Sequence, residues 1–283
     1  MSTLDKTIGF IGAGNMAEAM IGALIASRTI NSANVMACDI SGEKLDVLKR
    51  SYNIRITPEA GILFSSSDIV ILAVKPQVMG AVLDQLTSAP SFISKRKKLI
   101  ISIAAGISLS RIEQVIYASL DQSSRALFPI IRVMPNTPSL VLEGMSGFCM
   151  NAFADEDDAR MTRIILESMG RALPCTENQM DAITAVSGSG PAYFFYMVEA
   201  MVEAGTNLGL NPDDALTLSV QTMKGAAKLL EKSSDSPEAL RKKVTSPGGT
   251  TEAALGFLRD AGFKDIVKKA LAAAATRSKE LSA

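Results

Sequence analysis

The sequence predicts an α/β fold, in which an N-terminal Rossmann domain with a doubly wound sheet precedes an all-α C-terminal dimerisation domain. Three observations lead to this prediction. Short apolar strands alternate with helical patterns in the first half, which is typical of a parallel sheet covered by helices. A glycine-rich turn follows the first strand, and strand signals stop near Thr176. With 283 residues, two domains are expected, which we place at residues 1–175 and 176–283.

The expected strands of the first domain are short apolar runs at residues 8–11, 35–38, 69–74, 99–103 and 130–133. Helical patterns lie between them at residues 16–26, 42–51, 77–86 and 110–120. A further pair of strands is predicted near residues 147–150 and 171–174. The helix between that pair begins in the acidic run 155–158, whose charges complement a helix dipole.

The expected helices of the second domain begin at prolines or after glycines, as helices often do. They start at Pro191, Pro212 and Pro237, and after Thr251 and Gly262. The helix from Pro191 is apolar nearly all round, so it should be buried on most sides. A domain of this size could cover one such helix alone, but a homodimer interface is the favoured interpretation.

Composition excludes several functional classes. The chain has 29 basic and 29 acidic residues, which argues against a nucleic-acid-binding surface. We interpret the basic run at residues 95–98 as a solvated turn. Cys38, Cys149 and Cys175 form no CxxC pair, so no metal is expected, and a reducing cytoplasm is the simplest location. No signal peptide is expected at the N-terminus, and the glycines and proline within the uncharged run 182–198 argue against a membrane span.

The first glycine-rich turn has the spacing of a dinucleotide-binding site. Gly12 and Gly14 lie in the pattern G-x-G-x-x-A, which ends at Ala17. In such a turn the first glycine makes the bend, and the second lets the backbone approach a pyrophosphate at the helix N-terminus. A turn that serves helix packing alone is the alternative.

Asp39 ends the second expected strand and bears on which dinucleotide binds. It follows the glycine turn near the separation of about 20 residues at which an acid hydrogen-bonds ribose hydroxyls. A carboxylate there would repel a 2′-phosphate, and Lys44 is the nearest base. The sequence therefore leans towards NADH without excluding NADPH. A cap or turn role before Gly42 is the alternative for Asp39.

Other chemical groups follow the neighbouring strands. Lys75 ends the run IVILAVK, Ala104 and Ala105 follow the next strand, and Asn136 follows the one after. Ligands of open α/β sheets bind at the carboxyl ends of the strands. Lys75 is therefore expected near a bound cofactor, and Asn136 would offer its amide to the same crevice. An exposed surface lysine is the alternative for Lys75.

The chain contains no histidine. Dehydrogenases of alcohols need a group that exchanges the hydroxyl proton, usually His, Lys or Tyr. A cyclic imine makes a smaller demand, since it is partly protonated near neutral pH and needs only a hydroxyl near its nitrogen. The loop 245–251, with Gly249, Thr250 and Thr251 before a helix, offers such hydroxyls and backbone amides suited to a carboxylate. A second such loop contains Ser187, Ser189 and Gly190, for which close helix packing is the alternative.

These motifs occur in an order that resembles one enzyme family. The segments GFIGAGNMA, AVKPQ, SIAAG, RVMPNTP, SGSGPAYFF and TSPGGTTEAAL are similar to those of Δ1-pyrroline-5-carboxylate reductases. The resemblance implies reduction of 1-pyrroline-5-carboxylate to L-proline with NADPH or NADH, the last step of proline biosynthesis. It also implies an interlocked dimer, which in this family often assembles into decamers.

The resemblance also assigns roles to residues. Cofactor contacts would come from Ile11, Gly12, Ala13, Gly14, Asn15, Met16, Asp39, Ala73, Val74, Lys75, Pro76, Ala104 and Ala105. Substrate contacts would come from Ser187, Ser189, Gly190, Gly249, Thr250 and Thr251, with the Thr251 hydroxyl directed at the ring nitrogen or the carboxylate. The catalytic candidates are Thr251, Lys75 and Asn136. Two positions depart from the family: Asp39 replaces a small polar residue, and Ala60 stands where some members have a ribose-binding Asn.

Two other functions fit part of the pattern. A β-hydroxyacid dehydrogenase would share the glycine turn, but its K-x-x-N helix motif is missing from residues 176–283. A non-catalytic dinucleotide sensor would bind the nucleotide without producing proline, which a turnover assay distinguishes.

Overall fold

The computed structural model describes residues 3–89, 92 and 96–282. The chain divides into two compact units. The first comprises residues 1–189 together with 274–283, and the second comprises residues 190–273.

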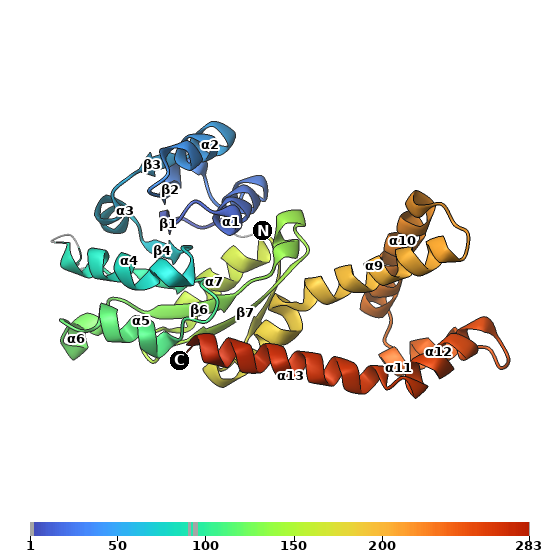
Figure 1. Ribbon diagram of the computed structural model, residues 1–283. Helices are drawn as coiled ribbons and strands as arrows, with labels where there is room; N and C mark the ends of the chain where they lie inside the picture. Colours follow the sequence, from blue (N-terminus) through green and yellow to red (C-terminus); the bar gives the residue numbers. More distant parts are fainter. Residues whose placement is uncertain (1–2, 90–91, 93–95, 283) are drawn as a thin grey trace. The chain divides into compact units, whose positions relative to one another are not determined.

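The first unit is built on an eight-stranded sheet with the order β3-β2-β1-β4-β5-β6-β7-β8 (Figure 1). Its strands are β1 (Ile8–Ile11), β2 (Val35–Cys38), β3 (Arg55–Thr57), β4 (Ile69–Leu72), β5 (Leu99–Ser102), β6 (Ile130–Met134), β7 (Gly144–Met150) and β8 (Gly170–Pro174). Its helices are α1 (Asn15–Ala26), α2 (Gly42–Tyr52), α3 (Ala60–Ser66), α4 (Pro76–Ser88), α5 (Leu109–Ile116), α6 (Gln122–Arg125), α7 (Glu156–Glu167) and α8 (Met180–Ile183). The strand order reverses direction between β1 and β4, the switch point at which such sheets bind ligands.

Helices cover both faces of this sheet. On one face, α1, α2 and α7 contribute buried residues such as Leu24, Leu48 and Ile165 to one apolar cluster. On the other face, α3 and α4 contribute Leu63 and Leu83 to a second cluster. Strands buried on both faces are continuous apolar runs rather than alternating ones, which is why the sequence revealed them.

The predicted strands are confirmed, with two corrections to the sheet. The short strand β3 and helix α3 were not predicted, because residues 55–57 carry only one buried side chain and no apolar run. Strand β7, from the further predicted pair, joins the parallel sheet in the antiparallel direction beside β6, a direction that the sequence did not predict. The connection between β6 and β7 is too short for the crossover of a dozen or more residues that parallel neighbours need.

The second unit is entirely helical in its described secondary structure. It holds α9 (Gly190–Asn207), α10 (Pro212–Lys232), α11 (Pro237–Lys243), α12 (Thr250–Asp260) and the first part of α13 (Phe263–Ser282). Helices α9 and α10 pack against each other. Phe194, Phe195 and Tyr196 on α9 are nevertheless 60%, 59% and 74% exposed. A single chain thus leaves this helix largely uncovered. The alternative that its own domain buries the apolar helix is therefore wrong.

The compact units divide later in the chain than the predicted boundary at residues 175 and 176. The intervening segment packs on the sheet of the first unit: a Cβ added at Gly147 of β7 would lie 2.8 Å from Ile183. Near the chain end, Ser278 Oγ of α13 donates to Asp181 Oδ1 at 2.7 Å. Both contacts join segments that are distant in sequence, so no local composition change marks this division.

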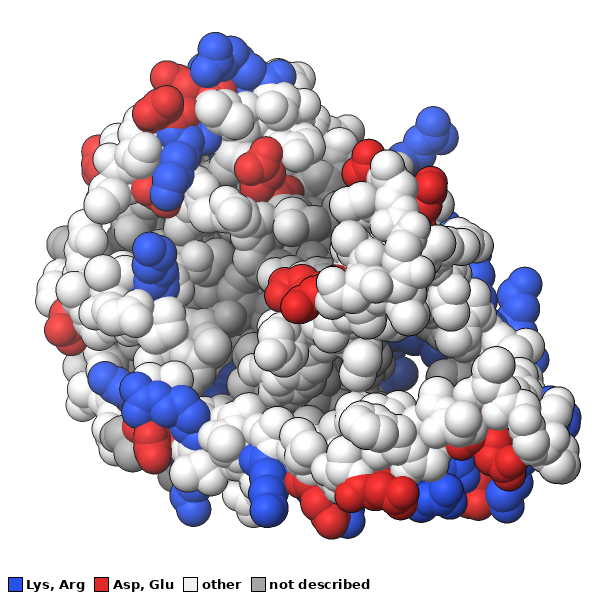
Figure 2. All heavy atoms as spheres, turned by 45° about the vertical axis from the view of Figure 1, so that its right-hand side comes forward, with Lys and Arg blue, Asp and Glu red and all other residues white. Residues whose placement is uncertain are grey.

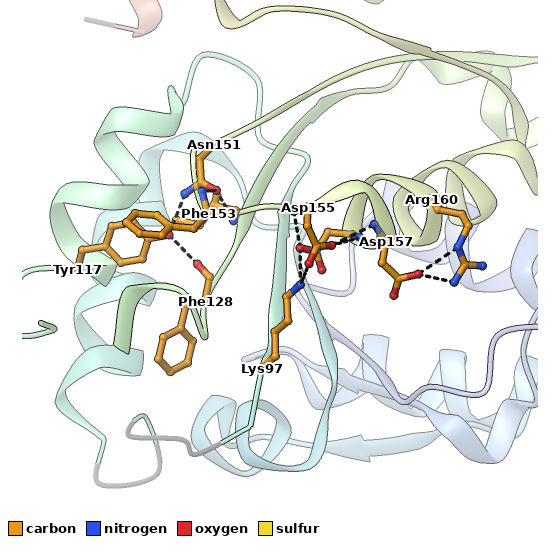
Figure 3. Close-up of polar contacts among 10 residues, drawn as sticks. Lys97, Tyr117, Phe128, Asn151, Phe153, Asp155, Asp157 and Arg160 are labelled. Atoms are coloured by element: carbon orange, nitrogen blue, oxygen red, sulfur yellow. Dashed lines mark hydrogen bonds and ion pairs between the residues drawn. The ribbon is translucent and has the colours of Figure 1, made fainter. Parts of the chain in front are cut away.

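The basic run at residues 95–98 is not simply a solvated turn. Lys95 lies outside the described residues, but Lys98 is only 5% exposed. Its Nζ donates to the carbonyl oxygens of Ser65 at 3.1 Å and Ser67 at 2.8 Å. Lys97 Nζ lies 2.7 Å from both Asp155 Oδ2 and Asp158 Oδ2 (Figure 3). The expectation was therefore wrong for Lys98, because local sequence does not show which carbonyl groups surround a lysine.

Charged side chains of both signs are interspersed on the face shown in Figure 2. This agrees with the equal numbers of basic and acidic residues. Within the described part of the chain, no helix has the length and apolar character needed to cross a membrane.

Candidate functional site

The glycine turn lies where three neighbouring strands end. Gly12 has φ +105°, and a Cβ there would lie 2.5 Å from the Ala73 carbonyl oxygen. Gly12 N–H donates to the Cys38 oxygen at 2.8 Å, and Ala73 N–H donates to the Ile11 oxygen at 2.8 Å. Only glycine fits this turn, because φ and the neighbouring backbone both exclude a side chain.

The N-terminus of α1 has room for an anion. Its N-cap is Gly14, which makes no side-chain cap hydrogen bond. A Cβ added at Gly14 would meet no atom within 4 Å. The space beside Gly14 is therefore open, and the backbone N–H groups of the first helical turn lack partners within a helix by its geometry. A pyrophosphate fits this place sterically and electrostatically.

Asp39 is bonded to the glycine turn itself. Its Oδ2 accepts from Ala13 N–H at 2.7 Å, and its Oδ1 accepts from Ser41 N–H at 2.9 Å. The cap of α2 is Ser41, whose Oγ accepts from Lys44 N–H, so Asp39 is not that cap. Its bond to Ser41 N–H, two residues on, does give Asp39 the turn role before Gly42. The carboxylate keeps further lone pairs, and Ile40 beside it is fully exposed.

The other predicted cofactor residues lie at the same carboxyl edge. Lys75 is the N-cap of α4 with Pro76 in its first turn, and the Lys75 side chain is exposed. Ala104 is buried and Ala105 is exposed after β5. Because β2, β1, β4 and β5 are adjacent and parallel, the fold brings together residues 11–16, Asp39, 73–76 and 104–105.

Asn136 does not point to free space. It is 8% exposed, and its Oδ1 accepts from Met145 N–H at 2.8 Å. Its Nδ2 donates to the Ser187 carbonyl oxygen at 3.2 Å and lies 3.4 Å from Ser187 Oγ. Residues 184–188 form one π-helical turn, in which Ser189 N–H donates to the Thr184 oxygen at 2.8 Å. Such turns are frequent at functional sites.

The loop before α12 also presents an open helix N-terminus. Gly249 is the N-cap without a side-chain cap bond, but its N–H donates to the Ser246 oxygen at 3.0 Å. Gly248, at φ +69°, donates to Glu252 Oε2 at 2.7 Å. The Gly249 amide that was expected to hold a carboxylate is therefore already engaged. The amides of Thr250 and Thr251 begin the helix, where no intrahelical acceptor reaches them.

A cavity of about 920 Å³ lies in the helical unit beside this loop. Thr245 of the loop, Glu252 of α12 and Asp265 of α13 line it. The lining also holds five cationic side chains: Arg241, Lys242, Arg259, Lys264 and Lys268. Sequence reasoning missed these residues, which are dispersed over α11, α12 and α13. Their only signal was the recurrence of basic residues across that part of the chain.

Glu177 is a second residue that sequence reasoning missed. Its Oε1 accepts from Arg132 Nη1 at 2.6 Å and from Leu109 N–H at 3.1 Å, and its Oε2 accepts from Cys149 Sγ at 2.8 Å. Burial raises the pKa of the Cys149 thiol, and the adjacent carboxylate raises it further. Glu177 thus ties the start of α5, which follows the turn at residues 104–105, to strand β6.

Comparison with known proteins agrees with this architecture. The family described as pyrroline-5-carboxylate reductase dimerisation matches residues 177–281. The family described as NADP oxidoreductase coenzyme F420-dependent matches residues 7–106. These ranges correspond to the helical region and to the part of the sheet that carries the glycine turn.

Full-length relatives have one name in common. Pyrroline-5-carboxylate reductase from Pseudomonas aeruginosa is 42% identical over 97% of this chain and 96% of its own. The Synechocystis enzyme is 38% identical over 97% of both chains. A solved pyrroline-5-carboxylate reductase from Coxiella burnetii has a TM-score of 0.90 at 36% identity, covering 99% of this chain and 100% of its own. A Plasmodium falciparum pyrroline carboxylate reductase, solved with NADP bound, has a TM-score of 0.85 at 30% identity and covers 100% of both chains. This oxidoreductase therefore belongs to the pyrroline-5-carboxylate reductase family.

Proposed function

We propose that this enzyme reduces 1-pyrroline-5-carboxylate to L-proline with NADH or NADPH, the last step of proline biosynthesis. The observation that carries the proposal is the open N-terminus of α1, which follows the turn at Gly12 and Gly14 and lies at the switch point of the sheet. The family's named members support the substrate. When bound, the dinucleotide supplies the hydride that the imine carbon gains, while the ring nitrogen takes a proton.

Residues of the loop before α12 would hold the substrate. The amides of Thr250 and Thr251 would bind its carboxylate, since they open a helix without a side-chain cap. Thr251 is half-buried, and its hydroxyl would be directed at the ring nitrogen. The neighbouring cavity is lined by five cationic and two acidic side chains, and this positive excess favours an anionic substrate. Lys75, exposed at the sheet edge, remains a candidate for orientation near the cofactor.

We infer a preference for NADH from the turn after β2. The Asp39 carboxylate is fixed by the Ala13 and Ser41 amides, so it cannot move away from the ribose without losing both bonds. The next side chain, Ile40, is apolar and exposed and offers no charge to a 2′-phosphate. A fixed carboxylate with an uncharged neighbour favours a ribose hydroxyl over a phosphate.

The test is the initial rate of pyrroline-5-carboxylate reduction with each dinucleotide, in wild type and in Asp39→Ser. We expect turnover with both and a higher kcat/KM with NADH. In Asp39→Ser, the ratio should move towards NADPH by roughly ten-fold, about 1.4 kcal/mol. An unchanged ratio would reduce Asp39 to a turn residue, and no turnover with either dinucleotide would refute the imine substrate.

We further propose a cytoplasmic homodimer that can assemble into decamers. The matched dimerisation family and the exposed apolar residues of α9 support the dimer. The three free cysteines suit a reducing compartment.

A further inference from the structure

We infer that Asn136 is a positioning residue, which acts by fastening the π-helical turn at residues 184–188 to the sheet rather than by touching the nicotinamide. This inference rests on the proposed function, because it assumes that this turn borders the substrate. Asn136 stands at the end of β6, so its position alone suggests a cofactor contact. Its hydrogen bonds point to a different role.

The first argument is the use of its side-chain amide. An asparagine side chain has one carbonyl oxygen and two N–H donors. The oxygen accepts from Met145 N–H at 2.8 Å, and Nδ2 reaches the Ser187 carbonyl oxygen and Oγ. Buried at 8% exposure, Asn136 has its polar atoms committed to two other segments of the chain. It therefore acts as a clamp between β7 and the π-helical turn.

The second argument is the close approach of these segments. A Cβ added at Gly188 would lie 2.4 Å from Met134 Cε of β6. A Cβ added at Gly147 would lie 2.8 Å from Ile183, just before the turn. A glycine in the turn and a glycine in the sheet thus let the turn lie against the sheet. The hydrogen bond from Asn136 then sets the orientation of the turn.

The third argument is the unusual local conformation that such a bond can maintain. A π-helical turn is rare, and here it places Ser187 and Ser189 directly before α9. Without the Asn136 donor, the Ser187 carbonyl would lose its partner, and the turn could relax towards an ordinary helical turn. A displacement of about 1 Å in a substrate-positioning segment can lower a rate by about 100-fold.

The decisive variant is Asn136→Asp. An aspartate keeps the acceptor for Met145 N–H and, once ionised, loses the donor to Ser187, with almost no change in volume. Because burial favours the protonated form, which could still donate, the variant is assayed above neutral pH. We expect kcat/KM for the imine to fall at least ten-fold, with a raised KM for the imine. The dissociation constant of NADH, from fluorescence titration, should stay within two-fold. Amide hydrogen exchange at Ser189 should accelerate, because its bond to Thr184 closes the π-helical turn.

Asn151→Asp is the matched control. Asn151 is 9% exposed and also commits its amide, donating to Glu113 Oε1 at 2.9 Å and to Tyr117 Oη at 2.8 Å. Figure 3 shows the contact with Tyr117. Asn151 lies at the opposite end of β6, bonded to Ile130 N–H. We expect Asn151→Asp to lower the unfolding temperature without changing the imine KM or exchange at Ser189. Asn136→Gln, which keeps the donor on a longer arm, provides a second variant if Asn136→Asp does not fold.

The outcomes separate the alternatives. If Asn136→Asp weakens NADH binding but spares the imine KM, Asn136 acts at the cofactor and the inference is wrong. If kcat/KM and KM for the imine and amide exchange at Ser189 all match wild type, the hydrogen bonds of Asn136 do not position the turn and the inference is wrong. A wild-type enzyme that binds NADH but does not reduce the imine would refute the proposed function instead, while accelerated Ser189 exchange in Asn136→Asp would still establish the clamp.

Discussion

At the scale of single residues, the two glycines of the first turn have different physical roles. Gly12 is required by the backbone, because φ is +105° and the Ala73 carbonyl lies where a Cβ would stand. Gly14 has φ −82° and open space beside it, so the fold tolerates a side chain there. The space at Gly14 is the space that a pyrophosphate would occupy.

The pair Gly12→Ala and Gly14→Ala therefore separates folding from binding. We expect Gly12→Ala to destabilise the protein by about 2 kcal/mol or more, through strain and a backbone clash. Gly14→Ala should change stability by less than about 1 kcal/mol but weaken NADH binding at least ten-fold. Urea unfolding and NADH fluorescence titration measure these quantities. Undiminished NADH affinity in Gly14→Ala would place the pyrophosphate elsewhere.

Thr251 is the residue on which the proposed chemistry most depends. Thr251→Ala removes the hydroxyl and keeps the backbone amide, so we expect kcat/KM for the imine to fall about 100-fold with little change in NADH affinity. Thr245→Ala is the control in the same loop, since its hydroxyl already donates to the Arg241 oxygen at 2.7 Å. Equal activity of Thr251→Ala and wild type would remove Thr251 from the mechanism.

At the scale of elements, α7 shows how one helix start is fixed to the sheet. Asp155 is its N-cap and forms a reciprocal capping box with Asp158, and Lys97 from the segment before β5 bridges both carboxylates (Figure 3). The hydrogen bond from Lys97 lowers the pKa of Asp155 to about 2. Burial has the opposite effect on Asp158 and raises its pKa.

This cap predicts a pH-dependent contribution to stability. Because the pKa of Asp155 is depressed in the folded state, its contribution is present above about pH 4 and lost as pH falls towards about 2. Asp155→Asn keeps the cap but loses the ion pair, which at this exposed position costs up to about 1 kcal/mol at pH 7. Urea unfolding at pH 7 and pH 3 should show a difference from wild type that shrinks at low pH. A difference that stays constant would show that the ion pair is not responsible.

At the scale of the whole molecule, the helical unit is incomplete as a single chain. Large apolar side chains of α9 and α10 are exposed, including Phe195 and Leu218. Exposed apolar patches of this extent mark protein interfaces, and the same region matches the dimerisation family. A second copy of the chain is the partner that both observations support.

Phe195→Glu tests this assembly. Phe195 is 59% exposed in one chain, and a carboxylate buried there on association would be costly. We expect light scattering after size-exclusion chromatography to give a smaller assembly, with activity reduced in proportion. Glu203→Gln, an exposed position on the same helix, should leave the mass unchanged. An unchanged mass for Phe195→Glu would exclude this face of α9 from the interface.

The sequence by itself determined the features whose signals are local. The four fully buried strands, β1, β2, β4 and β5, are almost entirely apolar. The helices of the second unit begin at prolines or after glycines, and the glycine turn has a fixed spacing. Each of these depends on residues within one turn or one strand. Hydrophobic periodicity and backbone preference report such local structure directly.

Only the tertiary structure decided the contacts between distant segments. It showed that β7 runs antiparallel to β6, that Lys98 is buried against the carbonyls of Ser65 and Ser67, and that Asn136 bonds to Ser187. It also showed that Glu177 joins α5 to β6. The side chains involved have several possible partners of equal chemistry along the chain, and the topology alone selects which of them come within hydrogen-bond distance.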